Sequence, residues 1–343
     1  MQTLLNTLYL TLPGYLHLEN DTLRFEVERE SRLRVPLHHI GSVVCFGDVL
    51  VSPAVMGRLA EDGKSLVILD RNGRFKARLE GPISGNILLR QAQFARANDP
   101  DFVLAHAKAC IAGKLRNSRY VLLRGARDAN GEPDAGVLRQ TAEALASNLR
   151  HLETAPTLDV VRGLEGESAR RYFAAFPHLL RGDQRENFAL DGRTRRPPRD
   201  RMNALLSFLY SMMMNDCRTA LETVGLDPQL GYLHTVRPGR AALALDLMEE
   251  FRAMLADRLA LTLVNRKQLN ASDFEARPGG AVQMDDAARK VLVLAYQERK
   301  QELVSHPLLD QKLAIGLLPQ IQARLLARVI RGEAEDYLPY LER

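Results

Sequence analysis

The hydrophobic pattern of this chain changes its period once, close to residue 81. Upstream, apolar residues such as Leu23, Phe25 and Val27 alternate with polar ones, and this period of two predicts half-buried strands. Downstream, apolar residues recur every three to four positions, which is the period of amphipathic helices. The pattern therefore predicts an α+β fold, with a small, mainly β N-terminal domain followed by a larger, all-α helical domain.

The predicted domain boundaries follow from this change. Residues 1–80 form the β-rich domain, in which Ser52 and a first-turn proline begin one short helix. Residues 81–98 contain a linker, GPISG, and a first helix. Residues 99–343 form the helical domain. A chain of 343 residues is longer than a domain with a single hydrophobic core usually is, which agrees with two domains.

Within the helical domain, the periodic segments predict individual helices. A long helix begins at Asp99-Pro100, and further helices are predicted over 134–152, 166–176, 202–224, 240–260, 286–300 and 319–331. Two glycines and a proline interrupt the pattern between residues 274 and 284, where either a loop or a short hairpin is expected.

Composition and charge narrow the functional classes. No segment approaches the ~18 uninterrupted apolar residues of a membrane helix, and the N-terminus lacks the basic start of a signal peptide. The widely spaced Cys45, Cys110 and Cys217 fit neither a disulfide framework nor a paired zinc motif, so we expect a cytoplasmic protein. A net charge of +5 favours a polyanionic partner. The absence of tryptophan argues against base stacking, so contacts with a phosphate backbone are expected instead.

Three clusters in the predicted helical domain contain candidate metal ligands, and the first two contain only one or two such residues each. Glu165 and Glu167 lie at a predicted helix start among glycines, where acids also simply favour the N-terminus of a helix. His234 ends the string GYLH and precedes Asp246 by twelve residues. A half-buried, hydrogen-bonded histidine is the alternative to a ligand there.

The third cluster is the segment 241–252, an apolar helix with three acids. Asp246 lies one turn from Glu249 and Glu250, so at least two carboxylates share a face. Like charges at this spacing repel, and we expect no lysine or arginine in the same turn to offset them. A divalent cation resolves the conflict, because carboxylate oxygens with one imidazole suit Mg²⁺ or Mn²⁺. A solvated acidic stripe is the alternative.

A basic segment lies between the first and second clusters. Two consecutive prolines keep it extended, and Asp200 is its one acid. Because guanidinium groups bind phosphates as a fork, we predict an exposed, weakly ordered DNA-contacting loop; a solvated connector is the alternative. Its candidate DNA-binding residues are Arg193, Arg195, Arg196, Arg199 and Arg201.

Together these clusters resemble a known family. The strings LEG at 164–166, NALLS at 203–207, GYLH at 231–234 and LALDLMEEFR at 243–252 are similar to those of the CRISPR-associated adaptation integrases, the Cas-one family, in the form found in subtype I-C systems. The resemblance covers nearly the whole chain. It implies that Glu165, His234 and Glu249 are catalytic ligands of Mg²⁺ or Mn²⁺, and that Asp246 is a further catalytic acid. It assigns no role to Glu167.

The resemblance also implies a reaction and partners. A metal-dependent DNA endonuclease and integrase would join prespacer 3′-hydroxyls to repeat phosphodiesters by transesterification, in CRISPR spacer acquisition. Two homodimers, each held through residues 1–80, would flank a dimer of a small second adaptation protein, and this heterohexamer would bind double-stranded prespacer and repeat-leader DNA. Two alternatives stay open: a metal-dependent nuclease of branched repair or recombination DNA without integration, and a non-catalytic DNA-binding scaffold.

Overall fold

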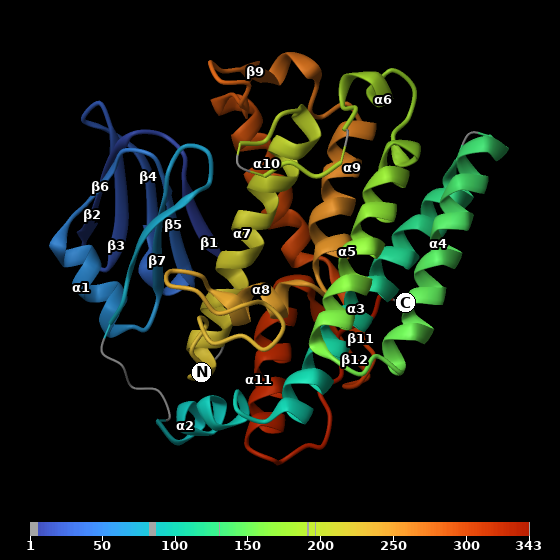
Figure 1. Cartoon of the computed structure of the whole chain (residues 1–343). Coiled ribbons are helices and arrows are strands. Elements are labelled where there is room, and N and C mark those ends of the chain that lie inside the picture. Colours follow the sequence, from blue (N-terminus) through green and yellow to red (C-terminus); the bar gives the residue numbers. More distant parts are fainter. Residues whose placement is uncertain (1–5, 82–86, 130, 191, 196, 343) are drawn as a thin grey trace.

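The computed structural model describes residues 6–81, 87–129, 131–190, 192–195 and 197–342. It confirms the α+β fold, with sheets in the N-terminal region and a mostly helical remainder (Figure 1). None of the helices within these residues is long and apolar enough to cross a membrane.

Two four-stranded sheets contain the strands predicted in the N-terminal region. The strand order is β1 (Thr7–Leu10), β5 (Ser42–Phe46), β7 (Ser65–Leu69), β8 (Phe75–Leu79) in one sheet and β4 (Glu30–Pro36), β3 (Thr22–Val27), β2 (Gly14–Glu19), β6 (Val49–Val51) in the other. Both sheets share one core with helix α1 (Pro53–Glu61), in which Leu23, Val43 and Val55 are fully buried. As predicted, the Ser52 side chain caps α1 by accepting a hydrogen bond from the backbone N–H of Val55.

Most of the remaining described chain is helical. Its α-helices are α2 (Ile87–Arg96), α3 (Pro100–Asp128), α4 (Glu132–Glu153), α5 (Leu158–Ala175), α6 (Gln184–Asn187), α7 (Arg201–Val224), α8 (Ala242–Met248), α9 (Arg258–Asn265), α10 (Asp286–Gln301) and α11 (Leu318–Ile330). Short 3-10 turns lie at Leu37–His39, Phe176–Leu179, Ala271–Asp273 and Ile315–Leu317. The predicted helices over 134–152, 202–224, 286–300 and 319–331 are confirmed to within two residues.

Two short hairpins interrupt the mostly helical C-terminal region, and the second of them corrects the expectation of an all-helical domain. Strands β9 (Phe274–Ala276) and β10 (Val282–Met284) pair across the interruption that favoured either a loop or a hairpin. Strands β11 (Leu303–His306) and β12 (Gln311–Ala314) form a second pair that the sequence pattern did not indicate. Strands of three or four residues are too short to establish a period of two, so only their pairing identifies them.

Helix α5 begins at Leu158, eight residues earlier than predicted, where the side chain of Thr157 caps it. Glu165 therefore lies in the middle of a helix and not at its start. A start at residue 166 is wrong because Gly163 and Gly166, although poor helix formers, both lie inside α5. Both have open space around them within α5, and a helix tolerates each at a cost of about 1 kcal/mol.

The predicted helix over 240–260 is interrupted. Helix α8 ends at Met248, a turn covers residues 249–251, and a π-helical segment, Arg252–Asp257, precedes α9. The apolar pattern continues through the interruption, so periodicity alone did not show it. π-Helical turns occur often at functional sites.

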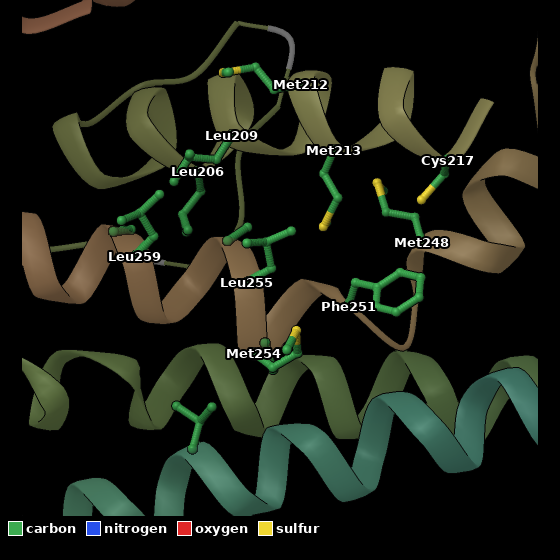
Figure 2. Close-up of a cluster of buried hydrophobic side chains, with 14 of the residues drawn as sticks. Leu206, Leu209, Met212, Met213, Cys217, Met248, Phe251, Met254, Leu255 and Leu259 are labelled. Carbon is green, nitrogen blue, oxygen red and sulfur yellow. The ribbon is translucent and has the colours of Figure 1, made fainter. Parts of the chain in front are cut away.

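Apolar side chains hold this interrupted segment in place. Figure 2 shows Met248, Leu255 and Leu259 between the segment and α7, with Phe251 and Met254 on its opposite side. All five are at most 6% exposed. The acidic residues of the same segment are therefore presented from a backbone that is fixed by close packing.

The sheets contact the helical region through several side chains. The rings of Phe46 and Phe208 stack with their centroids 5.3 Å apart. Arg289 donates a hydrogen bond to the carbonyl oxygen of Arg71 at 2.5 Å. A Cβ at Gly73 of the β7–β8 turn would lie 3.1 Å from the ring of Phe208, so this turn lies beside helix α7.

Candidate active site

Three segments that are far apart in the sequence meet around the ammonium group of Lys114. Lys114 lies within α3, Glu165 within α5, and Glu249 in the turn after α8. The Nζ atom of Lys114 pairs with Oε1 of Glu165 and lies 2.9 Å from Oε2 of Glu249. The side chain of Glu249 is 2% exposed and that of Glu165 is 31% exposed, so the site has a buried floor and an open side.

His234 lies on the other side of Glu249. Its Nδ1 is 2.7 Å from Oδ1 of Asp246, and its Nε2 is 3.6 Å from Oε1 of Glu249. Because an ionised carboxylate only accepts hydrogen bonds, Nδ1 must carry the proton that Asp246 accepts. In the neutral imidazole the lone pair is then on Nε2, which is the atom nearest to Glu249.

Asp246 is buried, and both oxygens of its carboxylate accept hydrogen bonds from the segment 232–234. The backbone N–H groups of Tyr232, Leu233 and His234 donate to it at 2.7, 3.0 and 3.0 Å. The loop can approach so closely because residue 231 is glycine: a Cβ there would lie 2.8 Å from Oδ2 of Asp246. Asp246 thus holds His234 in place, as carboxylates behind metal-binding histidines commonly do.

Glu249 carries its charge despite burial. Burial opposes ionisation, but the charges of Arg252 and Lys114 outweigh it and lower the pKa of Glu249 to about 2. Arg252 lies 3.0 Å from Oε1 of Glu249 and its guanidinium stacks over the ring of Tyr210. The expectation that no basic residue offsets the acids in this turn is therefore wrong, because Arg252 follows Glu249 by three residues.

Glu250 faces away from these groups. It accepts hydrogen bonds from Tyr337 at 2.5 Å, from Gln322 at 3.1 Å, and from the backbone N–H of Tyr340. Burial raises the pKa of Glu250 to about 8, although these hydrogen bonds act in the opposite direction. Glu250 thus fastens the C-terminal segment onto the helices and is not part of the site.

The donor groups suit a hard divalent cation. Glu165 and Glu249 both contact the ammonium group of Lys114, and the imidazole of His234 lies 3.6 Å from the other oxygen of Glu249. Carboxylate oxygens together with an imidazole are ligands that suit Mg²⁺ or Mn²⁺. Within the described residues, no three histidine, cysteine, aspartate or glutamate side chains are grouped closely enough to hold a metal ion directly. Lys114 lies between Glu165 and Glu249 and supplies the positive charge there.

Sequence reasoning missed Lys114 and Arg252. Lys114 did carry a signal, since it lies on the apolar face of α3 between the buried residues Ile111 and Leu115. A lysine in such a place is almost always paired with an acid. Its partners come from other helices, so the sequence did not identify them.

Two arginines of the predicted DNA-contacting loop make hydrogen bonds within the chain. Arg193 donates to the side chains of Asn203 at 2.6 Å and Ser207 at 3.0 Å, and Arg201 donates to the carbonyl oxygen of Asn187 at 2.8 Å. The expectation that the whole segment is exposed is wrong for these residues, because polar groups of α6 and α7 bind their guanidinium groups. Arg195 and Arg199 are exposed, and Arg196 lies outside the described residues.

A basic groove of about 770 Å³ separates the β7–β8 turn from α7. Among the described residues that line it, Asp70 is the only acid. The lining arginines are Arg71, Arg74, Arg195, Arg218, Arg240 and Arg289. The groove reaches Leu245 of α8, the residue before Asp246.

Comparison with known proteins identifies the family. Residues 8–298 match the model of the family described as "CRISPR associated protein Cas1". The chain is 56% identical to the CRISPR-associated endonuclease Cas1 1 of Moorella thermoacetica and 44% identical to that of Chlorobaculum tepidum. Each of these matches covers 100% of both chains.

Solved structures agree with this fold. A Cas1 protein from Thermotoga maritima has a TM-score of 0.81 at 22% identity, over 97% of this chain and 98% of that chain. A casposase bound to its integration product has a TM-score of 0.83 at 21% identity, over 97% and 92%. With the family match over most of its length and relatives of such high identity, this chain belongs to the Cas1 family of CRISPR-associated proteins.

Proposed function

We propose that this protein cleaves and joins DNA at a divalent-metal site formed by Glu165, His234 and Glu249. Membership of the Cas1 family makes it an endonuclease and integrase of CRISPR spacer acquisition. One observation carries the position of the site: two carboxylates from separate segments share the ammonium group of Lys114, and the imidazole of His234 lies 3.6 Å from one of them.

The surrounding residues prepare these ligands for the reaction. Mg²⁺ or Mn²⁺ bound there would polarise the scissile phosphate and stabilise the leaving oxygen. Asp246 accepts a hydrogen bond from the Nδ1–H group of His234, and the lone pair on Nε2 is thereby directed towards Glu249. Arg252 keeps Glu249 ionised and adds a positive charge on the side away from Lys114.

The proposed substrate is double-stranded prespacer DNA together with the repeat and its leader. The 3′-hydroxyl of the prespacer attacks a repeat phosphodiester, so that one P–O bond forms as another breaks and no nucleotide cofactor is consumed. With water in place of the hydroxyl, the same site cleaves DNA. A duplex entering through the basic groove between the β7–β8 turn and α7 would bring its backbone to this site.

A strand-transfer assay tests this function. The purified chain and its small partner protein are incubated with a repeat-bearing plasmid, a labelled duplex and Mn²⁺ or Mg²⁺. Joined strands at the repeat boundary are expected. Cleavage without joining would favour the branched-DNA nuclease, and DNA binding without either product would favour the non-catalytic scaffold.

The exposed arginines are expected to contribute to DNA binding through phosphates. In the variant Arg195→Ala/Arg199→Ala, each lost contact should reduce the salt dependence of binding by about one unit in the log–log slope. Every duplex should be affected alike, because phosphate contacts carry no sequence information. Fluorescence anisotropy between 50 and 300 mM salt (roughly the range in which such slopes are measured) checks this.

The matched control for this experiment is Arg139→Ala/Arg150→Ala. Both residues are exposed arginines of α4, so the variant loses the same charge from a different face. If the two double variants have the same slope, the loop is a connector and the DNA follows another path.

We propose a homodimer held through residues 1–80, with residues 81–98 as linker and first helix and residues 99–343 as the catalytic domain. Tyr15 on β2 lies opposite Leu50 on the edge strand β6, and these side chains are 42% and 71% exposed. An exposed apolar pair at a sheet edge is a surface that a second copy would cover.

Light scattering of the wild-type chain should give the mass of a dimer, and Leu50→Asp should give that of a monomer. A monomeric wild-type chain at micromolar concentration would contradict this.

The remaining assignments are finer than family membership. We propose a heterohexamer of two such dimers with a dimer of the small second adaptation protein. In support, a chain of a solved complex that contains Cas1 and Cas2 has a TM-score of 0.83 to this protein, and the match covers 36% of that chain. We also propose the subtype I-C form, from the resemblance of the sequence. Cys45, Cys110 and Cys217 are buried and unpaired, which supports a reducing, cytoplasmic location.

A further inference from the structure

Lys114 is placed where a lysine is unusual. It extends from the apolar face of α3, and its side chain is only 11% exposed. Lysines are almost never buried to this degree without a partner of opposite charge. Both of its partners are carboxylates that we assign to the divalent cation, so its position needs an explanation beyond the fold.

The charges around Lys114 are balanced. Glu165 and Glu249 contribute two negative charges, and Lys114 and Arg252 contribute two positive charges. Arg252 lies 3.0 Å from Oε1 of Glu249, whereas Lys114 lies 2.9 Å from Oε2. Without Lys114, the carboxylates of α5 and of the turn after α8 would face each other with no cation between them, which is unfavourable in a partly buried site.

We propose that the ammonium group of Lys114 takes the place of the divalent cation in the metal-free chain and competes with it for Glu165 and Glu249. This inference rests on the metal site of the proposed function. An ammonium group is a compact, strongly hydrated charge on a flexible four-carbon stem, so it can bridge two carboxylates and also withdraw from them. Lys114 thus holds the two carboxylates close together until a cation displaces it.

Two consequences distinguish competition from a merely structural ion pair. A competitor weakens metal binding, so removing its charge should tighten the binding of the metal. A competitor also stabilises only the metal-free chain, so its loss should destabilise that form more than the metal-bound form. A structural ion pair would contribute equally to both forms and would leave metal affinity unchanged.

The test is a Mn²⁺ titration of the full chain without DNA, in which free Mn²⁺ is measured by electron paramagnetic resonance at constant pH. Lys114→Met preserves most of the side-chain volume and removes the charge. We expect its Kd for Mn²⁺ to fall about tenfold below that of the wild type, as expected when one nearby competing charge is removed. Lys114→Gln provides a second neutral variant should the methionine variant not fold.

The matched control is Lys108→Met. Lys108 lies on the same helix, donates to the carbonyl oxygen of Glu153 and contacts neither candidate ligand, so its variant loses the same charge at a distance. Its Kd should equal that of the wild type. Lys114→Arg keeps the charge and should bind Mn²⁺ no more tightly than the wild type.

Thermal unfolding supplies the second readout. In EDTA, Lys114→Met should unfold at a lower temperature than the wild type, and saturating Mn²⁺ should reduce this difference. Equal destabilisation with and without Mn²⁺, or an unchanged or higher Kd in both neutral variants, would overturn the role of Lys114 while leaving the metal site intact. A wild-type chain that binds no Mn²⁺ at millimolar concentration would overturn the metal site as well.

Discussion

Glu165→Gln and Glu249→Gln are each expected to lower the rates of DNA joining and DNA cleavage by roughly a thousandfold or more, because each removes the negative charge of one proposed metal ligand. The two reactions should fall together, since one site serves both. DNA affinity should change far less, because it depends mainly on phosphate contacts along the basic groove. Single-turnover rates at saturating Mn²⁺ and Mg²⁺, with anisotropy for binding, measure both quantities.

Glu167→Gln is the control for this prediction. Glu167 lies two residues after Glu165 on the same helix, but it pairs with Arg171 and Asn148 outside the site. The hydrogen bond from Arg171 is the main cause of its lowered pKa. Its variant should keep wild-type rates. Wild-type activity in Glu165→Gln would place the metal site elsewhere.

Asp246→Ala is expected to lower the free energy of unfolding by about 3–5 kcal/mol and to lower activity to the level of the ligand variants. The substitution leaves three buried backbone N–H groups and the imidazole of His234 without their acceptor. His234 then loses the contact that sets its orientation and the position of its proton. Urea unfolding and the strand-transfer rate measure the two effects.

Gly231→Ala should likewise lower both stability and activity, because it disturbs the same hydrogen bonds from the loop side. The added Cβ would lie 2.6 Å from the carbonyl carbon of Ala242 and 2.8 Å from Oδ2 of Asp246, so the loop would have to move away from the carboxylate. Asp159→Ala removes an exposed carboxylate from the first turn of α5 and should have little effect. If Asp246→Ala is as stable as the wild type, the hydrogen bonds to its carboxylate do not hold the loop.

The elements that the sequence predicted well are those with a long, regular pattern. The strand of Leu23 and Phe25, the cap at Ser52 and the long helix α7 all depend on local periodicity or on a single capping side chain. Gly163 shows the limit of such reasoning, because a glycine inside a helix and a glycine that ends one have the same local signal.

The three proposed ligands were identified from the sequence by a resemblance in the strings around them, since spacing alone left alternatives open. The contacts that surround these ligands could not be predicted in this way. Glu250 has the same helical neighbours as Glu249, yet its carboxylate turns to Tyr337 and Tyr340, more than eighty residues later in the chain. No local pattern distinguishes the two acids.

The sequence by itself therefore determined the change from strands to helices, the burial of the helix faces and the residue types available for a metal. These depend on the hydrophobic pattern and on side-chain chemistry, which are properties of neighbouring residues. Only the tertiary structure decided which acid is ionised, which anchors the tail and which orients His234. The reason is physical: the state of a buried carboxylate depends on the charges and donors around it, and here Lys114, Arg252 and the loop at 231–234 are brought to Glu249 and Asp246 by the packing of separate helices.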